Sequence, residues 1–188
     1  MSEIIGFSGS YSRPSKTRAL VEAATLKAAQ STGLPHDVFD IGDLGPSLGG
    51  AQSLADLDQT GRALIDRLIN AQAIVVGSPV YKGSYTGLFK HVFDLIDPAA
   101  LHGKPVLLTA TGGGDKHALV IEHQLRPLFG FFEAATVPTG IYANAAYFEG
   151  SEAVGQSVGA RIDTAVAQLA AAIAATNRHH QPKAVNAA

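Results

Sequence analysis

Short apolar segments and segments of helical pattern alternate five times along the 188-residue chain. Each apolar segment is too short for a helix and rich in Val and Ile, which predicts a strand. The predicted strands cover residues 3–8, 36–41, 73–78, 105–110 and 136–141. The predicted helices cover residues 15–31, 53–71, 86–96, 117–134 and 151–176. The chain is therefore expected to repeat a strand-then-helix unit from end to end.

The predicted strands are apolar almost throughout, and such strands are covered on both faces of their sheet. With a helix after each strand, we expect a parallel sheet with right-handed crossovers. The predicted fold is therefore α/β, a flavodoxin-like, doubly wound, five-stranded parallel sheet in three α/β/α layers. A ligand of such a sheet binds at the carboxyl ends of the strands, near the switch in strand order. We expect one domain over residues 1–176 and a loose, polar C-terminal tail over residues 177–188.

Composition excludes several classes of protein. The net charge is only −2 and 46% of the residues are hydrophobic, which argues against a disordered chain and against a nucleic-acid partner. The sequence has no cysteine, so redox chemistry requires a bound cofactor. No apolar run approaches the roughly 20 residues of a membrane span and no signal peptide is recognisable, so we expect a cytoplasmic protein with no membrane partner. His179 and His180 lie in the predicted tail as surface residues, and we predict no metal site.

The sequence 9-GSYSRPSKT-17 follows the first predicted strand and opens the first predicted helix. Backbone N–H groups and the helix dipole make such a place an anion site. A P-loop is disfavoured because the second glycine is missing and the Lys-Thr pair is one place out of register, and the pattern G-x-G-x-x-G is missing too. The segment offers a terminal phosphate, as in FMN, the hydroxyls of Ser10, Ser12, Ser15 and Thr17 and the forked cation of Arg13. The alternative is a polar loop in which Ser15 only caps the helix.

The loops after the third and fourth predicted strands suit a planar ligand. The third strand leads into 78-SPVYKGSYTG-87, where Pro79 restricts the backbone, Tyr81 offers an aromatic face, and Gly83 and Gly87 allow close turns. The fourth leads into 110-ATGGG-114, whose glycines leave room for the edge of a ring. Three strand ends thus combine phosphate donors, an aromatic surface and a glycine-rich edge. This combination predicts a flavin site.

Three longer motifs resemble those of the NAD(P)H-dependent FMN reductases: 8-SGSYSRPSKT-17, 77-GSPVYKGSYTGLFKHVFDLIDPAALHGKPV-106 and 111-TGGGDKHALVIEHQLRPLFGFF-132. The resemblance covers residues 4–142 and is strongest to the reductase components of two-component alkanesulfonate and methanesulfonate monooxygenase systems. It implies that the FMN phosphate is held by Ser10, Arg13, Ser15 and Thr17. It also implies that the flavin ring is lined by Pro79, Val80, Tyr81 and Lys82. The polar edge of the ring is implied to meet Thr111, Gly112 and Gly113.

The resemblance also implies an activity. Hydride is transferred from NADPH or NADH to FMN, and reduced flavin is supplied to a partner monooxygenase in sulfonate-sulfur assimilation. The protein has mainly to stack the two rings and stabilise the negative charge of the reduced flavin, so no catalytic acid or base is obligatory. Members of the family form homodimers or homotetramers, which implies self-association of this chain.

The segment 117-HALVIEHQLRPLFGFF-132 is apolar on more than one side, which is wider than a helix covered by one sheet requires. It is either a core helix or part of a subunit interface, to which we also assign Phe89 and Phe93. In reductases of the alkanesulfonate systems, the resembling helix carries an inserted tyrosine that creates a π-bulge. His123 occupies the aligned position here. The resemblance therefore places a π-bulge and a subunit contact at His123, and Pro127 adds a local break in the helix.

Two other activities share these features. A related quinone or azo-compound reductase would keep FMN bound and pass electrons to an organic acceptor, so retention of FMN through purification would favour it. A flavodoxin-type electron carrier has the same fold but no pyridine-nucleotide site, and it is typically strongly acidic, unlike a chain of net charge −2. The sequence does not distinguish NADPH from NADH.

Overall fold

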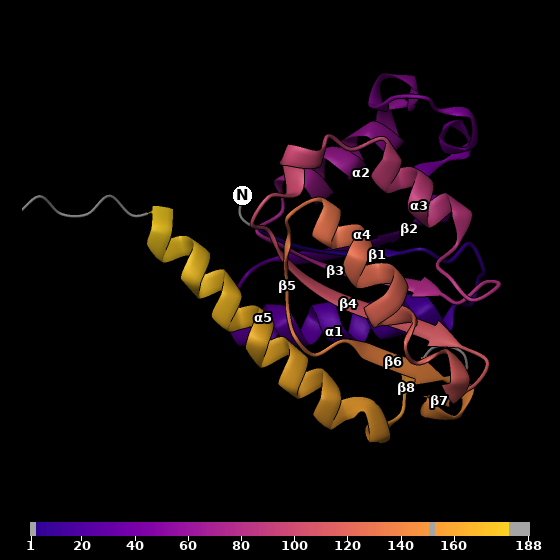
Figure 1. Ribbon diagram of the computed structural model, residues 1–188, viewed down its shortest axis with the longest axis vertical. Coiled ribbons are helices and arrows are strands. Elements are labelled where there is room, and N and C mark those ends of the chain that lie inside the picture. Colours follow the sequence, from indigo (N-terminus) through magenta and orange to yellow (C-terminus); the bar gives the residue numbers. More distant parts are fainter. Residues whose placement is uncertain (1–2, 151–152, 181–188) are drawn as a thin grey trace, which may run out of the picture.

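The computed structural model describes residues 3–150 and 153–180 of the chain. Its centre is a six-stranded parallel sheet in the order β2-β1-β3-β4-β5, in which β6 also pairs with β4 (Figure 1). The strands are β1 (Ile4–Ser8), β2 (His36–Asp40), β3 (Ala73–Pro79), β4 (Pro105–Gly112), β5 (Ala135–Thr136) and β6 (Ile141–Asn144). The α/β class and the parallel pairing predicted from the apolar runs are confirmed.

The prediction of five strands was wrong, because the fifth predicted strand is interrupted. β5 pairs with the start of β4 and β6 pairs with its end, so the two short strands share one edge of the sheet. Pro138 lies between them and has no N–H to donate to a neighbouring strand. The N–H of Thr139 donates instead to the side chain of Gln168, at 2.9 Å.

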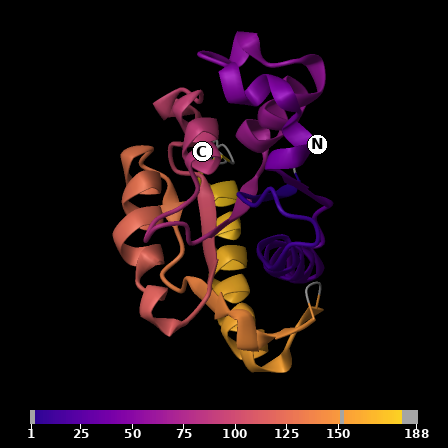
Figure 2. The same ribbon diagram turned by 90° about the vertical axis from the view of Figure 1, so that its right-hand side faces the viewer.

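Within the described residues, five α-helices cover the sheet. They are α1 (Lys16–Thr32), α2 (Gln59–Asn70), α3 (Gly87–Asp94), α4 (Arg126–Phe131) and α5 (Gly159–His180). α1 and α5 lie on one face and α2, α3 and α4 on the other, which gives three layers (Figure 1). The purple segment between β2 and α2 contains the 3₁₀ helices η1 (Ile41–Leu44), η2 (Pro46–Gly50) and η3 (Leu54–Asp56). It projects at the top of both views (Figure 1 and Figure 2).

The last helix begins and ends later than the sequence predicted. Residues 151–176 were expected to be helical, whereas the antiparallel strands β7 (Phe148–Glu149) and β8 (Ala153–Val154) precede α5. Gly150 between them has a φ of 78°, which favours a reversal of the chain over the start of a helix. α5 then continues through residues 177–180, the first part of the predicted tail. The side chains of His179 and His180, and all of residues 181–188, lie outside the described residues.

The sheet divides the core into two apolar clusters. On the side of α1 and α5, the small side chains of Ala24 and Ala28 let α1 lie close to the sheet. On the other side, the ring of Phe89 lies 5.6 Å from that of Phe7 and 4.9 Å from that of Phe93. Phe89 and Phe93 are 0% and 1% exposed within a single chain, so the expectation that they are buried between subunits was wrong. None of the helices in the described residues is both long and apolar enough to span a membrane.

Candidate functional site

Three loops meet at the carboxyl edge of the sheet: the first loop (residues 9–15), the second loop (residues 80–86) and the third loop (residues 113–117). The hydroxyl of Thr17, in the first turn of α1, lies 2.6 Å from the hydroxyl of Thr111 at the end of β4. The hydroxyl of Thr86 donates to the carbonyl oxygen of Gly9 at 2.9 Å. The N–H of Val80 donates to the carbonyl oxygen of Thr111 at 2.7 Å. The loops that the sequence singled out are therefore bonded to one another.

The first loop presents polar groups where α1 begins. Ser15 is the N-cap of this helix, and its Oγ accepts a hydrogen bond from the N–H of Arg18 at 3.2 Å, as the capping interpretation expected. The Ser15 hydroxyl still has its own hydrogen to donate. The first N–H groups of the helix have no acceptor within the helix and add to this donor set. Ser10 is 5% exposed, and its Oγ accepts from the N–H of Ser12 at 3.3 Å, which shapes the turn of the loop.

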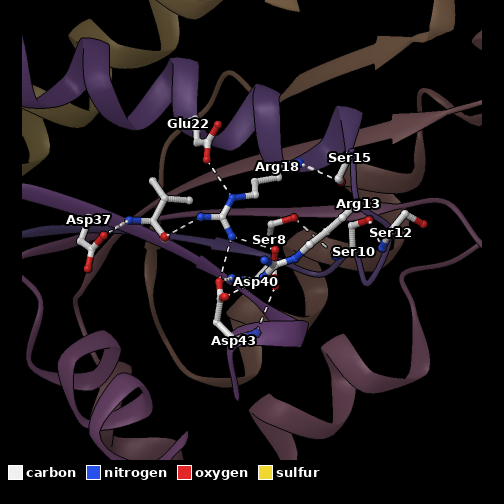
Figure 3. Close-up of polar contacts among 11 residues, drawn as sticks. Ser8, Ser10, Ser12, Arg13, Ser15, Arg18, Glu22, Asp37, Asp40 and Asp43 are labelled. Atoms are coloured by element: carbon white, nitrogen blue, oxygen red, sulfur yellow. Dashed lines mark hydrogen bonds and ion pairs between the residues drawn. The ribbon is translucent and has the colours of Figure 1, made fainter. Parts of the chain in front are cut away.

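Arg13 points from the first loop toward the end of β2 (Figure 3). Its Nη2 lies 3.0 Å from Oδ1 of Asp40 and 2.6 Å from Oδ1 of Asp43. Arg18 contacts the second oxygen of each carboxylate, at 2.7 Å for Asp40 and 2.8 Å for Asp43. Partial burial raises the pKa of Asp43, but the N–H of Asp40 and the two guanidinium groups outweigh it and hold the pKa below its usual range. The contact of Arg13 with phosphate stays a prediction, and in this structure carboxylates hold its guanidinium.

The second loop contains a tight turn at residues 81–84, whose ends exchange two backbone hydrogen bonds of 2.8 and 3.1 Å. Lys82 has a φ of 52°, which places it in the left-handed region used by turns that join paired strands. Tyr81 is 58% exposed, so its ring is accessible to a planar ligand. Pro79 and Val80 are half-buried at the base of the loop.

The glycines at the third loop have two different roles. A Cβ at Gly112 would collide with the hydroxyl of Tyr142, so this glycine makes room for the wall of the site. That hydroxyl donates to the carbonyl oxygen of Gly114 at 2.5 Å, and burial raises the pKa of Tyr142. A Cβ added at Gly113 or Gly114 would meet no atom within 4 Å. These two glycines therefore border open space that can admit the edge of a ring.

The helix after the third loop is irregular at the predicted position. Ile121–Leu125 form a π-helix, which contains His123 and leads into α4. The hydroxyl of Ser84 donates to Oε1 of Gln124 at 3.0 Å, so the π-helix contacts the second loop. His123 and Gln124 also line a groove of ≈ 620 Å³ between α3 and α4. Phe131, which lines the same groove, is 70% exposed.

Sequence reasoning missed four residues that build this region: Thr86, Gln124, Asp40 and Asp43. Thr86 was detectable, because threonine directly before a predicted helix is a common N-cap, and its Oγ1 accepts from the N–H of Phe89 here. Asp40 and Asp43 cap each other locally, but their arginine partners are supplied by the tertiary fold, as is the Ser84 partner of Gln124.

The donor set fits the flavin mononucleotide that the sequence implied. Hydroxyls and helix N–H groups suit a phosphate, the exposed ring of Tyr81 suits a planar ring system, and the open space at Gly113 suits its edge. Among the residues that the structure describes, no group of three His, Asp or Glu side chains is placed to hold a metal ion.

A doubly wound parallel sheet with such a site at the carboxyl ends of β1, β3 and β4 defines a flavodoxin-like flavoprotein. Solved structures support the fold. A flavodoxin from the domain Archaea superposes with a TM-score of 0.59 at 13% identity and covers 93% of this chain and 99% of its own.

The chain belongs to the NADPH-dependent FMN reductase family, whose family model matches residues 2–149. It is 42% identical over 168 residues to FMN reductase (NADPH) of Pseudomonas aeruginosa, covering 89% of this chain and 90% of that protein. NADH-dependent FMN reductase SfnF of Pseudomonas fluorescens is 41% identical with the same coverage. The apo structure of the NADH:FMN oxidoreductase EMOB has a TM-score of 0.81 at 27% identity and covers 100% of both chains. The chain is therefore an oxidoreductase whose cofactors are FMN and a reduced pyridine nucleotide.

Proposed function

We propose that the protein reduces FMN as a substrate with NADPH or NADH and releases the reduced flavin to a monooxygenase of sulfonate-sulfur assimilation. The observation that carries this proposal is the openness of the site. Tyr11 in the first loop and Tyr81 in the second loop are 72% and 58% exposed, and Gly113 borders open space, which supports a site that flavin can enter and leave. The relatives named as FMN reductases support FMN as the substrate. The resemblance of the sequence motifs supports the monooxygenase partner.

In this proposal the chain contributes binding and orientation. When bound, FMN supplies the acceptor of the hydride. Ser10, Ser15 and the N–H groups at the start of α1 hold the phosphate, and Tyr81 supports the ring. The contact between Thr17 and Thr111 keeps the phosphate end and the ring-edge end of the site at a fixed separation. Orientation of this kind is what a hydride transfer between two stacked rings requires from a protein.

The proposal includes self-association in the cytoplasm, as a homodimer or homotetramer. Phe131 is a large exposed aromatic residue in the groove that His123 lines, next to Pro127 and Leu128, and contiguous exposed apolar surface of this kind marks interaction sites. A second subunit in this groove would touch the π-helix. Through the bond between Gln124 and Ser84, such a contact reaches the second loop of the site.

A steady-state assay tests the activity, with NADPH and NADH as donors and FMN, FAD and riboflavin as acceptors. We expect oxidation of the nucleotide only when flavin is added, with the highest efficiency for FMN because riboflavin has no phosphate. Equal efficiency with riboflavin would contradict the phosphate site. Lack of flavin-dependent oxidation with both nucleotides would contradict the function itself.

A reductase of quinones or azo compounds that retains FMN is the second candidate. It is favoured by a 28% identity over 104 residues to FMN-dependent NADPH-azoreductase of Staphylococcus aureus, which covers 55% of each chain. Gel filtration after incubation with FMN separates the two candidates. Elution without flavin supports FMN as a substrate, and elution with one FMN per chain supports the retaining reductase.

A further inference from the structure

Two carboxylates and two arginines form a closed cluster beside the first loop (Figure 3). Asp40 is the last residue of β2 and is 1% exposed, and Asp43 lies in η1. Arg13 belongs to the first loop and Arg18 to α1. Arg13 contacts the Oδ1 atoms of both carboxylates, and Arg18 contacts both Oδ2 atoms. All four carboxylate oxygens therefore accept from a guanidinium group.

The carboxylates are fixed by the backbone as well. The N–H of Asp40 donates to Asp43 at 2.9 Å, and the N–H of Asp43 donates to Asp40 at 3.1 Å, which is the capping box of η1. Arg18 also donates to the carbonyl oxygen of Val38 at 3.1 Å and to Glu22 at 2.8 Å. This half of the cluster is thus held by β2, η1 and α1 together.

Arg13 is the member of the cluster that belongs to the first loop. Its side chain is 60% exposed, so ion pairs and not packing set the position of the guanidinium. Arg13 stands between Ser12 and the helix cap Ser15 in the sequence, and holding it restrains the backbone on both sides. A loop that is ordered before its ligand arrives loses less conformational entropy on binding.

We propose that Asp43 is a positioning residue for the flavin phosphate: it holds Arg13 and thereby fixes the first loop in the conformation that accepts the phosphate. This role rests on the proposed FMN site, and Asp43 acts on it through Arg13. The resemblance implied a different arrangement, in which Arg13 is itself a phosphate ligand. Asp43 would then compete with the phosphate for Arg13, and removing the carboxylate would strengthen FMN binding.

Asp43→Asn tests the proposal, because it keeps the shape of the side chain and removes its charge. Dissociation constants for FMN and riboflavin are measured by titration of the full-length protein. We expect the FMN dissociation constant to rise about threefold to tenfold, because a charge-assisted hydrogen bond that orders the loop becomes a neutral one. Riboflavin binding should not change, and KM for FMN should rise while kcat at saturating FMN stays the same. Tighter FMN binding, an equal change for both flavins, or no change would each overturn the proposal.

Asp37→Asn is the matched control. It removes an equal charge from a residue of β2 whose carboxylate pairs with Arg67 at 2.6 Å and forms no hydrogen bond or ion pair with Arg13 or Arg18. We expect this variant to keep the parent's ratio of FMN to riboflavin affinity. A change equal to that of Asp43→Asn would mean that net charge alone is responsible, and it would overturn the positioning role.

If Asp43→Asn does not fold, Arg13→Gln tests the proposal instead. The side chain of Arg13 is exposed, so we expect this variant to fold. It should weaken FMN binding by a similar factor, and the double variant should bind FMN no more weakly than either single one. Unchanged FMN binding in Arg13→Gln would overturn the proposal.

The affinities of the unmutated protein for FMN and riboflavin distinguish failure of the phosphate site from failure of the role of Asp43. No preference for FMN over riboflavin in the parent defeats the phosphate site together with Asp43's role, whereas a preference that survives Asp43→Asn defeats only the role of Asp43.

Discussion

The hydroxyl of Thr17 lies 2.6 Å from the hydroxyl of Thr111, although the two residues are 94 positions apart in the sequence. Thr17 lies in the first turn of the helix after β1, Thr111 is the last residue but one of β4, and the two residues are 2% and 7% exposed. In the sheet, β3 lies between β1 and β4, so this contact bridges over the end of a central strand. The first and third loops are therefore held as one unit.

Thr17→Val tests this link, because valine keeps the shape of the side chain and leaves the buried Thr111 hydroxyl without its partner. Losing such a partner costs about 1–3 kcal/mol, so we expect urea denaturation to show a free energy of unfolding lower by about that amount. Adding Thr111→Val removes the orphaned hydroxyl, so the double variant should be less destabilised than the sum of the single ones. Thr164→Val is the control, since that exposed hydroxyl bonds to its own helix. Simple additivity in the double variant would argue against a direct link.

Gly113→Ala tests whether the open space at Gly113 serves ligand binding and not the stability of the fold. Nothing lies within 4 Å of a Cβ at Gly113, so the fold should keep its melting temperature. FMN should bind more weakly, because the methyl group enters the space assigned to the edge of the ring. Gly49→Ala, at an equally open position in η2, should leave FMN binding unchanged. Unaltered FMN affinity in Gly113→Ala would remove the third loop from the site.

Much of the fold was predictable because buried parallel strands carry a strong local signal. Each central strand is an apolar run, and each is followed by a helix, so the order of elements could be read from the sequence. The second helix begins at Gln59 and not at residue 53, and the larger errors lie at the last strand and helix. Pro138 interrupts the fifth predicted strand, and Gly150 reverses the chain where a helix was expected.

The parts of the candidate site that depend on the composition of a loop were predictable from the sequence. The contacts that depend on residues distant in the sequence were not. The hydroxyls of the first loop and the glycines of the third follow strands whose carboxyl ends share an edge. By contrast, the carboxylates that hold Arg13 lie 27 and 30 residues away and form their pairs only in the fold. The sequence also could not show whether Phe89 and Phe93 are buried in the core or between subunits, because an aromatic pair at helical spacing fits both places.

Acid should remove the stabilisation that Asp43 contributes. Partial burial raises the pKa of Asp43. The hydrogen bond from the Asp40 N–H and the contacts with Arg18 and Arg13 lower it by more, so the pKa in the folded protein lies below the usual value. A carboxyl with a depressed folded pKa stabilises the protein above its unfolded pKa, about 3.9, and this stabilisation is lost as pH falls through the folded value. The free energy of unfolding of the parent should therefore exceed that of Asp43→Asn by a constant amount from about pH 5 to 8, and the difference should begin to shrink below about pH 4 as pH falls toward the folded pKa. Urea denaturation across this pH series measures it, and a gap that persists at the acid end would contradict the assignment.

Deletion of His123 tests the function of the π-helix. Removing one residue should convert Ile121–Leu125 into regular α-helix, because a π-helix absorbs one extra residue locally. The bond between Gln124 and Ser84 should then change, and we expect FMN to stay bound and steady-state turnover with free FMN to fall. His123→Ala, which keeps the chain length, should have the smaller effect. Flavin occupancy and turnover equal to the parent's in the deletion variant would make His123 an ordinary helical residue.

Phe131→Ser tests the groove between α3 and α4 as the contact between subunits. Phe131 is 70% exposed, so the replacement should leave the stability of a single chain nearly unchanged. In a two-fold symmetric contact, both subunits bury their Phe131 side chain. At about 1.5–3 kcal/mol for each side chain, its loss should raise the dissociation constant of the assembly about a hundredfold to ten-thousandfold.

Light scattering at micromolar concentration measures the outcome. The parent should have at least the mass of a dimer, and Phe131→Ser should shift toward the monomer. Leu26→Ser is the control, because Leu26 is 46% exposed on α1, on the opposite face of the sheet from this groove. A monomeric parent would contradict self-association. An oligomeric parent whose mass falls with Leu26→Ser and not with Phe131→Ser would place the contact on the face of α1. Such a contact would lie apart from the groove beside α4, which His123 lines.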